Sequence, residues 1–212
     1  FAGNSEAGRY GDTIQEIDWS IGQILAELKR QGLDENTLVI FTSDNGPWLP
    51  YGNHAGSSGI LREGKGTVFE GGIRVPCIAR WPGNIPQNIV SNTFWTTVDF
   101  LPTFAKLAGA RLPRLKIDGV DANYVLRQES SIPTQRTFPY YLWSGDLQAL
   151  RWGKWKLHFP HNHRHQAGKP GQDGIANGEV QAKIELSLFD LEADPSESKN
   201  VSNFHSNVVS RL

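Results

Sequence analysis

The first forty residues carry two hydrophobic patterns in succession. Apolar residues recur at helical spacing at positions 14, 17, 21, 24, 25 and 28, which predicts an amphipathic helix that ends near Gly32. An unbroken run from Leu38 to Thr42 follows. Such a run is typical of a central strand of a parallel sheet, buried on both faces. Helix and strand together form one half of an α/β unit.

The α/β pattern continues to about residue 134. Residues 73–81 predict another strand, and residues 94–108 predict a helix with Phe100, Phe104 and Leu107 on one face. Residues 46–66 hold many glycines and little periodicity, as expected of a long active-site loop. We therefore expect residues 1–134 to form one domain of α/β type.

After residue 135 the pattern becomes short, aromatic and closely spaced. Tight turns separate three such segments and predict an antiparallel meander, formed by residues 138–143, 147–152 and 154–159. Residues 186–191 predict one more strand, and Val208 with Val209 indicates a short terminal helix. The polar, glycine-rich residues 160–185 are expected to form an exposed loop. Residues 135–212 are thus predicted to be a separate antiparallel β subdomain.

Composition narrows the function classes only slightly. The chain of 212 residues is 38% hydrophobic, and its 21 basic residues balance 22 acidic ones, so charge gives no argument for nucleic acid or an anionic membrane. Its single cysteine, Cys77, excludes an internal disulfide framework. Cys77 lies in a strand-like context and is predicted to be a small buried hydrophobe.

Asp44 and Asn45 follow directly after the apolar run of residues 38–42. In open α/β sheets, ligands bind outside the carboxyl ends of the strands, which is where these two side chains are expected. Asp offers a charged oxygen and Asn a neutral carbonyl oxygen, the ligands preferred by Ca²⁺ and Mg²⁺. The alternative is an Asx turn that closes the strand, because Asp-Asn-Gly also favours turns.

The block from Phe41 to Gly83 is a long, ordered set of motifs: SDNG, then GKGTVFEGGIRVP, then WPG. It resembles the second signature region of the sulfatase family, in the alkaline-phosphatase superfamily. Segments elsewhere agree, so the resemblance covers nearly all of the chain; these segments are 8–12, 16–22, 98–103, 107–109, 117–119 and 188–195. It is closest to arylsulfatase A-like and N-acetylgalactosamine-6-sulfatase-like members.

The resemblance implies a fold and a chemistry. The fold is α/β, with a partial alkaline-phosphatase-like mixed sheet and flanking helices, followed by the small antiparallel subdomain. The chemistry is metal-assisted sulfate ester hydrolysis, with Ca²⁺ or Mg²⁺ and a formylglycine nucleophile. Sulfatases form that nucleophile in an N-terminal C-x-P-S-R or S-x-P-S-R segment, which this sequence lacks. We therefore expect a C-terminal portion that is inactive alone and needs the N-terminal half as its partner.

The resemblance also assigns roles to residues. Asp44 and Asn45 match the metal ligands, and Lys65 matches the lysine that contacts the sulfate ester. By itself Lys65 could be a solvated loop lysine. A phosphate-binding P-loop is disfavoured, because Gly66 stands where that motif needs Ser or Thr. Glu70 and Arg74 are expected to form structural pairs that support this loop.

The histidines are the remaining candidates. Four of the six cluster between residues 158 and 165; an alternating set of this kind can imitate a transition-metal site, but a solvated polar loop is the simpler interpretation. A third interpretation places this loop over the pocket, with His158 or His161 against the leaving group of the substrate. His54 is a candidate for the pocket entrance.

The sequence is also compatible with other functions. The same superfamily contains phosphodiester and phosphonate hydrolases, and the chain could also be an inert fragment or a binding module. The expected substrate is a sulfated small molecule or a sulfated glycan. The resemblance implies a periplasmic, secreted or lysosomal protein, and no run of 18 apolar residues predicts a membrane span.

Overall fold

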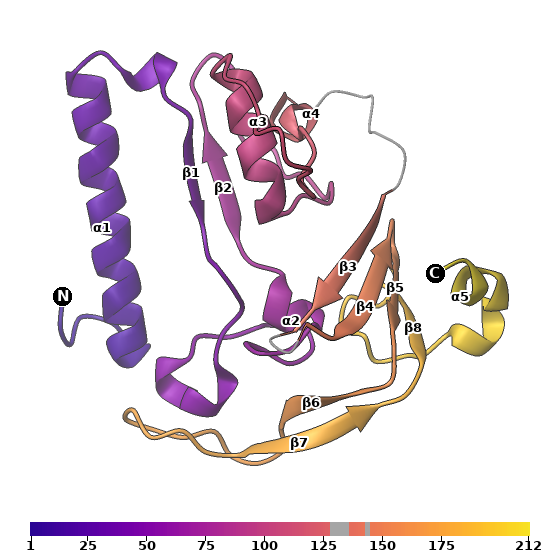
Figure 1. Ribbon diagram of the computed structural model, residues 1–212. Helices are drawn as coiled ribbons and strands as arrows, with labels where there is room; N and C mark the ends of the chain where they lie inside the picture. Colours follow the sequence, from indigo (N-terminus) through magenta and orange to yellow (C-terminus); the bar gives the residue numbers. More distant parts are fainter. Residues whose placement is uncertain (128–135, 143–144) are drawn as a thin grey trace. The chain divides into compact units, whose positions relative to one another are not determined.

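A computed structural model describes residues 1–127, 136–142 and 145–212 (Figure 1). The chain forms two compact units. The first contains residues 1–26, 42–77 and 135–212, and the second contains residues 27–41 and 78–134. The first unit also holds all candidate site residues. The predicted domain boundary between residues 134 and 135 stays a prediction.

The N-terminal helix α1 extends from Gly8 to Arg30. The carboxylate of Asp12 accepts hydrogen bonds from the backbone N–H groups of residues 3, 4 and 5 at 2.8–3.0 Å, which fastens the segment before the helix. Lys29 and Arg30 lie in the last turn, where positive charges interact favourably with the helix dipole. The isoleucines at 14, 17 and 24 are between 39% and 57% exposed, whereas the other three apolar positions, 21, 25 and 28, are partly buried, so about half of the apolar face predicted for α1 is uncovered.

Strand β1 (Val39–Thr42) pairs with β2 (Cys77–Arg80) in a two-stranded sheet, and the two strands run in opposite directions in Figure 1. The expectation of a parallel strand buried on both faces is wrong for β1. All four of its residues are only half-buried, because β2 is the one strand that pairs with it in the described part of the chain. Cys77 is exposed rather than buried, for the same reason.

The second unit is held together by polar contacts around short helices. The guanidinium of Arg80 donates two hydrogen bonds, of 2.6 and 2.8 Å, to the Asp34 carboxylate. Asp99 is 1% exposed and accepts the Val120 N–H at 2.9 Å. The helical elements of this unit are η1 (Asp34–Asn36), η3 (Thr97–Asp99), α3 (Phe100–Leu107) and α4 (Asn123–Arg127). The predicted helix at 94–108 is therefore confirmed, with a later start.

The predicted meander is confirmed as part of a four-stranded antiparallel sheet. Leu157 and Leu188 pack with Val208 of the terminal helix α5 (Ser206–Arg211) to form one apolar cluster. Gly153 has a φ of 57°, which suits the tight turn between the second and third strands. In spatial order the strands are β3 (Thr137–Tyr141), β4 (Leu147–Trp152), β5 (Trp155–His158) and β8 (Ser187–Asp190).

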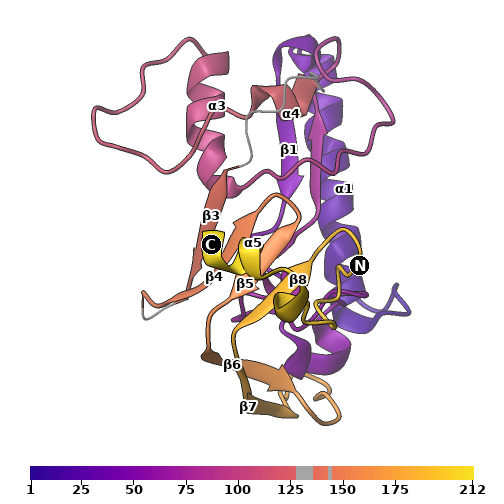
Figure 2. The same cartoon turned by 90° about the vertical axis from the view of Figure 1, so that its right-hand side faces the viewer.

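The loop expected at residues 160–185 is wrong for the two ends of this segment, which are strands, whereas residues 167–178 between them do form a mostly exposed connection. This segment forms a hairpin of β6 (His161–Gln166) and β7 (Glu179–Ile184), seen in Figure 2. Its sequence is polar, so it lacks the apolar alternation that signals a strand. His163 nevertheless is 3% exposed and packs edge-on against Phe69 at 4.8 Å. A histidine ring thus forms part of the buried face of this strand, a place that aliphatic side chains usually take.

Candidate functional site

Asp44 and Asn45 lie in the turn that follows β1. The next residue, Gly46, donates its N–H to the carbonyl of Gly72 at 2.9 Å. A Cβ on Gly46 would collide with the carbonyl of Gly71. The turn is therefore fastened to the glycine pair at residues 71 and 72, where only a glycine backbone can approach so closely.

The Lys65 loop is joined to the same turn. Lys65 donates its N–H to the carbonyl of Pro47 at 2.8 Å, and a Cβ on Gly64 would collide with that carbonyl. Lys65 itself is exposed, whereas the loop beyond it is buried from Thr67 to Gly72. The structure thus brings the backbone of Lys65 beside the segment that carries Asp44 and Asn45, on a tightly packed loop.

The oxygen donors present fit a hard cation, as part of a site. Asp44 is exposed, and its carboxylate accepts a hydrogen bond from the Ser43 hydroxyl at 3.5 Å. In the described residues it accepts none from a backbone N–H, as an Asx turn would require. Two oxygen donors are fewer than the six to eight that Ca²⁺ takes. No group of three or more His, Cys, Asp or Glu side chains suited to a metal occurs within the described ranges.

Behind the Lys65 loop lies a buried cluster of charges. Glu70 begins the short helix α2 (Glu70–Ile73) and is 2% exposed. Its carboxylate pairs with the Lys156 ammonium at 2.9 Å and with the Arg151 guanidinium at 3.7 Å. Lys156 also pairs with Glu197 at 3.0 Å, and both are fully buried. The expected structural pairing of Glu70 is found, whereas Arg74 is exposed and forms no ion pair with any other described residue.

His158 belongs to this cluster. It is fully buried, stacks on Phe69 at 4.6 Å, and its Nε2 lies 2.9 Å from Oε1 of Glu197. Burial lowers the pKa of His158 to about 4, against the opposing effect of Glu197. Burial by itself would raise the pKa of Glu197, but Lys156 and His158 hold it below its ordinary value. The cluster therefore contains a neutral histidine that donates to a carboxylate, and the substrate contact expected of His158 stays a prediction.

A dependence of stability on pH follows from His158. The ordinary pKa of 6.5 applies to the unfolded chain and about 4 to the folded one, so the unfolded state binds the proton first as pH falls. The stabilisation is complete above pH 6.5 and is lost as pH falls through 4, with a size on the order of 3 kcal/mol. Denaturant unfolding at pH 7, 5.5 and 4.5 measures it.

The control for this prediction is His158→Gln. Burial also lowers the pKa of His161 and of His163, and both remain in the variant, so its stability should still fall with pH, but less steeply. If the free energy of unfolding fell equally steeply with pH in the wild type and in the variant, the assignment of this pH dependence to His158 would be contradicted.

The other histidines are ordered by the hairpin. His161 and His163 are directed to neighbouring carbonyls, those of Phe159 at 2.7 Å and Arg164 at 2.8 Å. His165 contacts the Glu63 carboxylate at 2.7 Å. Alternation on β6 therefore places these rings in sequence along one strand, where their centroids are 6.1 to 6.4 Å apart.

His54 ends the 3-10 helix η2 (Leu49–His54) and is half-buried, with its ring edge-on to Tyr51 at 5.9 Å. The hairpin loop holds η2 in place, because the N–H groups of Gly171 and Asn177 both donate to the carbonyl of Pro50, at 2.9 and 3.0 Å. The structure thus brings the segment of His54 against the hairpin. Its role at a pocket entrance stays a prediction, as does that of His161.

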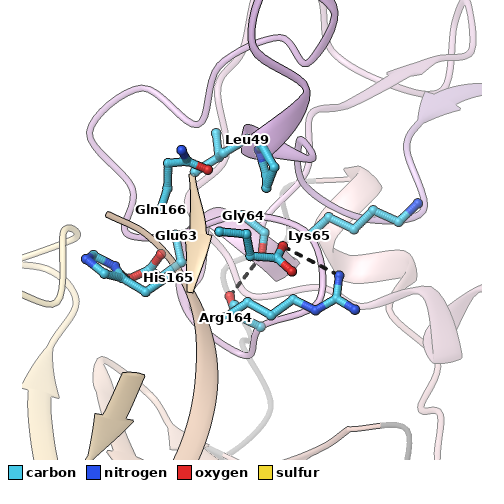
Figure 3. A pocket seen from close by; sticks show the side chains of 10 residues that line it. Leu49, Glu63, Gly64, Lys65, Arg164, His165 and Gln166 are labelled. Carbon is cyan, nitrogen blue, oxygen red and sulfur yellow. Dashed lines mark hydrogen bonds and ion pairs between the residues drawn. The ribbon is translucent and has the colours of Figure 1, made fainter. Parts of the chain in front are cut away.

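A hollow lined mainly by charged and polar residues lies between the Lys65 loop and the hairpin (Figure 3). The Arg164 guanidinium there pairs with Glu179 at 3.7 Å, and Glu63 is held by His165. Figure 3 shows the Lys65 side chain extending away from Glu63, with its ammonium apart from the Arg164 guanidinium. Within the described residues the Lys65 ammonium forms no ion pair with Glu63 or Glu179. The hollow is lined by residues 49, 50, 63–65, 67, 164–166 and 179.

Sequence reasoning missed Lys156 and Glu197. One signal was present: Lys156 and His158 alternate with Leu157 on a strand, so two polar residues share one face. Their partners lie 86 and 39 residues away, so no local pattern could have identified them.

Comparisons with known proteins match most of the chain to two family models. The Sulfatase family matches residues 2–110, and the C-terminal region of aryl-sulfatase matches residues 134–212. Bovine arylsulfatase A is 39% identical over 210 residues, covering 95% of this chain and 40% of that protein. Canine N-acetylgalactosamine-6-sulfatase is 44% identical over 162 residues, covering 75% and 30%. The chain thus spans about 40% or less of the length of these relatives.

Solved structures similar to this chain also include a sulfatase. The PsFucS1 sulfatase from Pseudoalteromonas sp. has a TM-score of 0.75 and 32% identity, covering 94% of this chain and 42% of that one. A protein described in work on glycosaminoglycan metabolism by Bacteroides thetaiotaomicron has a TM-score of 0.73 and 28% identity, covering 100% and 44%. The α/β fold with its antiparallel β portion is the one found in sulfatases. The chain therefore belongs to the sulfatase family.

Proposed function

We propose that the complete polypeptide containing this chain hydrolyses sulfate esters, and that these residues form one wall of its active site. The observation that carries the proposal is the 2.8 Å hydrogen bond from Lys65 N–H to the Pro47 carbonyl. It joins a loop with an exposed lysine to the turn that carries Asp44 and Asn45. The oxygens proposed to bind a cation and the ammonium proposed to bind the sulfate therefore belong to one packed support, within a chain of the sulfatase family.

The residues of this chain would act through charge and position. Asp44 and Asn45 would hold Ca²⁺ or Mg²⁺, which supplies stabilisation of the negative charge on sulfate oxygens when bound. Lys65 would donate to an ester oxygen, and its ammonium would meet the charge that develops as the ester bond breaks. Formylglycine, outside this chain, would supply the nucleophile. Residues 1–212 alone are accordingly proposed to be inactive.

The proposed substrate is a sulfated small molecule or a sulfated glycan. The relatives are named for aryl, steryl and N-acetylgalactosamine sulfate chemistry, which differ in the leaving group and share the sulfate ester. None of the helices in the described residues is long and apolar enough to cross a membrane. We infer a periplasmic, secreted or lysosomal location from the same family relation.

The test is a comparison of ester classes with the complete polypeptide. Turnover of an aryl sulfate is measured against that of the matching aryl phosphate monoester and diester, with Ca²⁺ or Mg²⁺ present. Preference for the sulfate supports the proposal. Preference for the diester would assign the protein to the phosphodiester hydrolases of the superfamily, and no turnover of either would favour a binding module.

Lys65→Ala should lower kcat/KM for the sulfate ester by about 100-fold or more, because one preorganised donor to a developing anion is lost. Since the Lys65 side chain is exposed, the melting temperature should be almost unchanged. Lys169→Ala, an exposed lysine on the hairpin loop, is the matched control and should retain full activity. Near-normal turnover in Lys65→Ala would remove Lys65 from the site.

A further inference from the structure

Glu197 is a buried carboxylate to which the proposed mechanism gives no task. It follows β8 and is fully buried, although the neighbouring residue Ser198 is exposed. Its φ of 49° lies in the left-handed region, which non-glycine residues seldom adopt. Asp194 stabilises this turn, because its carboxylate accepts the N–H groups of Ser198 and Lys199, both at 2.8 Å. The backbone is thus held in an unusual conformation that directs the Glu197 side chain inward.

Glu197 contacts both ends of the Lys65 loop. Its main-chain carbonyl accepts a hydrogen bond from the Arg62 guanidinium at 2.9 Å. Its Oε2 accepts the backbone N–H of Glu70 at 2.6 Å. Both ends of the segment 62–70 are therefore hydrogen-bonded to Glu197, and Lys65 lies between these two attachment points.

The remaining carboxylate oxygen fixes the direction of the side chain. Oε1 lies 3.0 Å from the Lys156 ammonium and 2.9 Å from Nε2 of His158. With two donors on one oxygen and a backbone N–H on the other, the carboxylate has one orientation. The Glu197 side chain therefore cannot rotate freely where it binds Glu70, the first residue of α2.

The attachment continues to the cation-binding turn. Gly71 donates to the carbonyl of Arg62 at 2.8 Å, and the carbonyl of Gly72 accepts the N–H of Gly46 at 2.9 Å. Any shift of Glu70 would therefore move the glycine pair and, with it, the turn that carries Asp44 and Asn45. Together with the hydrogen bond from the Glu70 N–H to Glu197, these two backbone hydrogen bonds link one buried carboxylate to both halves of the candidate site.

We propose that Glu197 is a positioning residue, which sets the place of Lys65 and of the Asp44–Asn45 turn for the proposed sulfate ester hydrolysis. The inference rests on that proposed function. Glu197 touches neither substrate nor cation. It acts by fixing the distance between Arg62 and Glu70, which keeps the backbone of Lys65 within hydrogen-bond distance of Pro47.

The test uses two variants of the complete polypeptide. Glu197→Gln keeps the shape but presents an NH₂ group either to the Glu70 N–H or to Lys156 and His158, so one attachment is lost. Glu197→Asp keeps the charge but shortens the side chain by about 1.5 Å, so it cannot reach all its partners. Glu192→Gln, an exposed glutamate of the same segment, is the control.

Four readouts are compared: kcat and KM for the sulfate ester, Ca²⁺ affinity by calorimetry, amide exchange of residues 62–72, and melting temperature. We expect kcat to fall about 10- to 100-fold in folded Glu197→Asp, with a smaller change in KM, weaker Ca²⁺ binding and faster exchange in the loop. Glu192→Gln should match the wild type in all four.

Two results would overturn the proposal. One is a folded variant whose kcat, Ca²⁺ affinity and loop exchange equal those of the wild type. The other is unfolding of both Glu197 variants at the assay temperature, which would assign the residue to stability alone. Failure of the proposed function is a separate outcome: the wild type would then hydrolyse no sulfate ester, while Ca²⁺ affinity and loop exchange would still report on Glu197.

Discussion

Asp44→Ala is expected to abolish cation binding and to lower the turnover of sulfate ester by about 1,000-fold in the complete polypeptide. Asp44 supplies the only charged oxygen of the two proposed donors, and a bound cation contributes several kcal/mol to stabilising the charge of the transition state. The side chain is exposed, so folding should be affected by no more than about 0.5 kcal/mol. Metal content and kcat, measured on the same sample, test both expectations.

Two matched variants sharpen this experiment. Asp44→Asn keeps an oxygen donor and loses the charge, so it should retain more cation affinity at high Ca²⁺ than Asp44→Ala does. Asp18→Ala removes an exposed carboxylate from α1 and should change neither metal content nor rate. Normal turnover and metal content in Asp44→Ala would contradict the proposed site.

Lys156→Met is expected to lower the free energy of unfolding by about 3 to 5 kcal/mol. The ammonium lies between the Glu70 and Glu197 carboxylates at 2.9 and 3.0 Å, and all three groups are buried. Removing it leaves two buried carboxylates, with the Arg151 guanidinium 3.7 Å from Glu70 as a partial compensation. Losing one partner of a buried ion pair is costly because the other charge stays buried without compensation.

Lys154→Met provides the control, two residues away on the same chain segment. Lys154 pairs with Asp190 at 2.6 Å, but its side chain is 38% exposed, and a surface pair of this kind contributes about 1 kcal/mol or less. Urea unfolding of both variants at pH 7 compares them directly. Equal midpoints for the two variants would contradict the buried ion cluster described above.

Much of the fold is predictable because its signals are local. The helix periodicity before Gly32, the run leading to Thr42 and the aromatic segments around Gly153 each depend on neighbours within a few residues. They correspond to α1, β1 and the β3–β4–β5 meander. The motif block from residue 41 to 83 is likewise contiguous, so the amino-acid sequence alone reveals its relation to sulfatases.

The hairpin β6–β7 is not predictable by the same means. Its alternating histidines are typical of a polar loop, and they form a strand because Phe69, nearly a hundred residues earlier, offers a ring for His163 to pack against. Likewise, the apolar run of β1 predicts a fully buried strand, yet coverage depends on neighbouring strands rather than on the strand itself.

By itself, the sequence determined the family of this protein, the order of most of its elements, and the positions of Asp44, Asn45 and Lys65 as candidates for binding a cation and a sulfate ester. Only the tertiary structure decided that Glu70, Lys156, His158 and Glu197 form one buried cluster that supports the Lys65 loop. The reason is physical: the ionisation and role of a charged side chain depend on which groups surround it. Here those groups are brought together from positions as far as 127 residues apart.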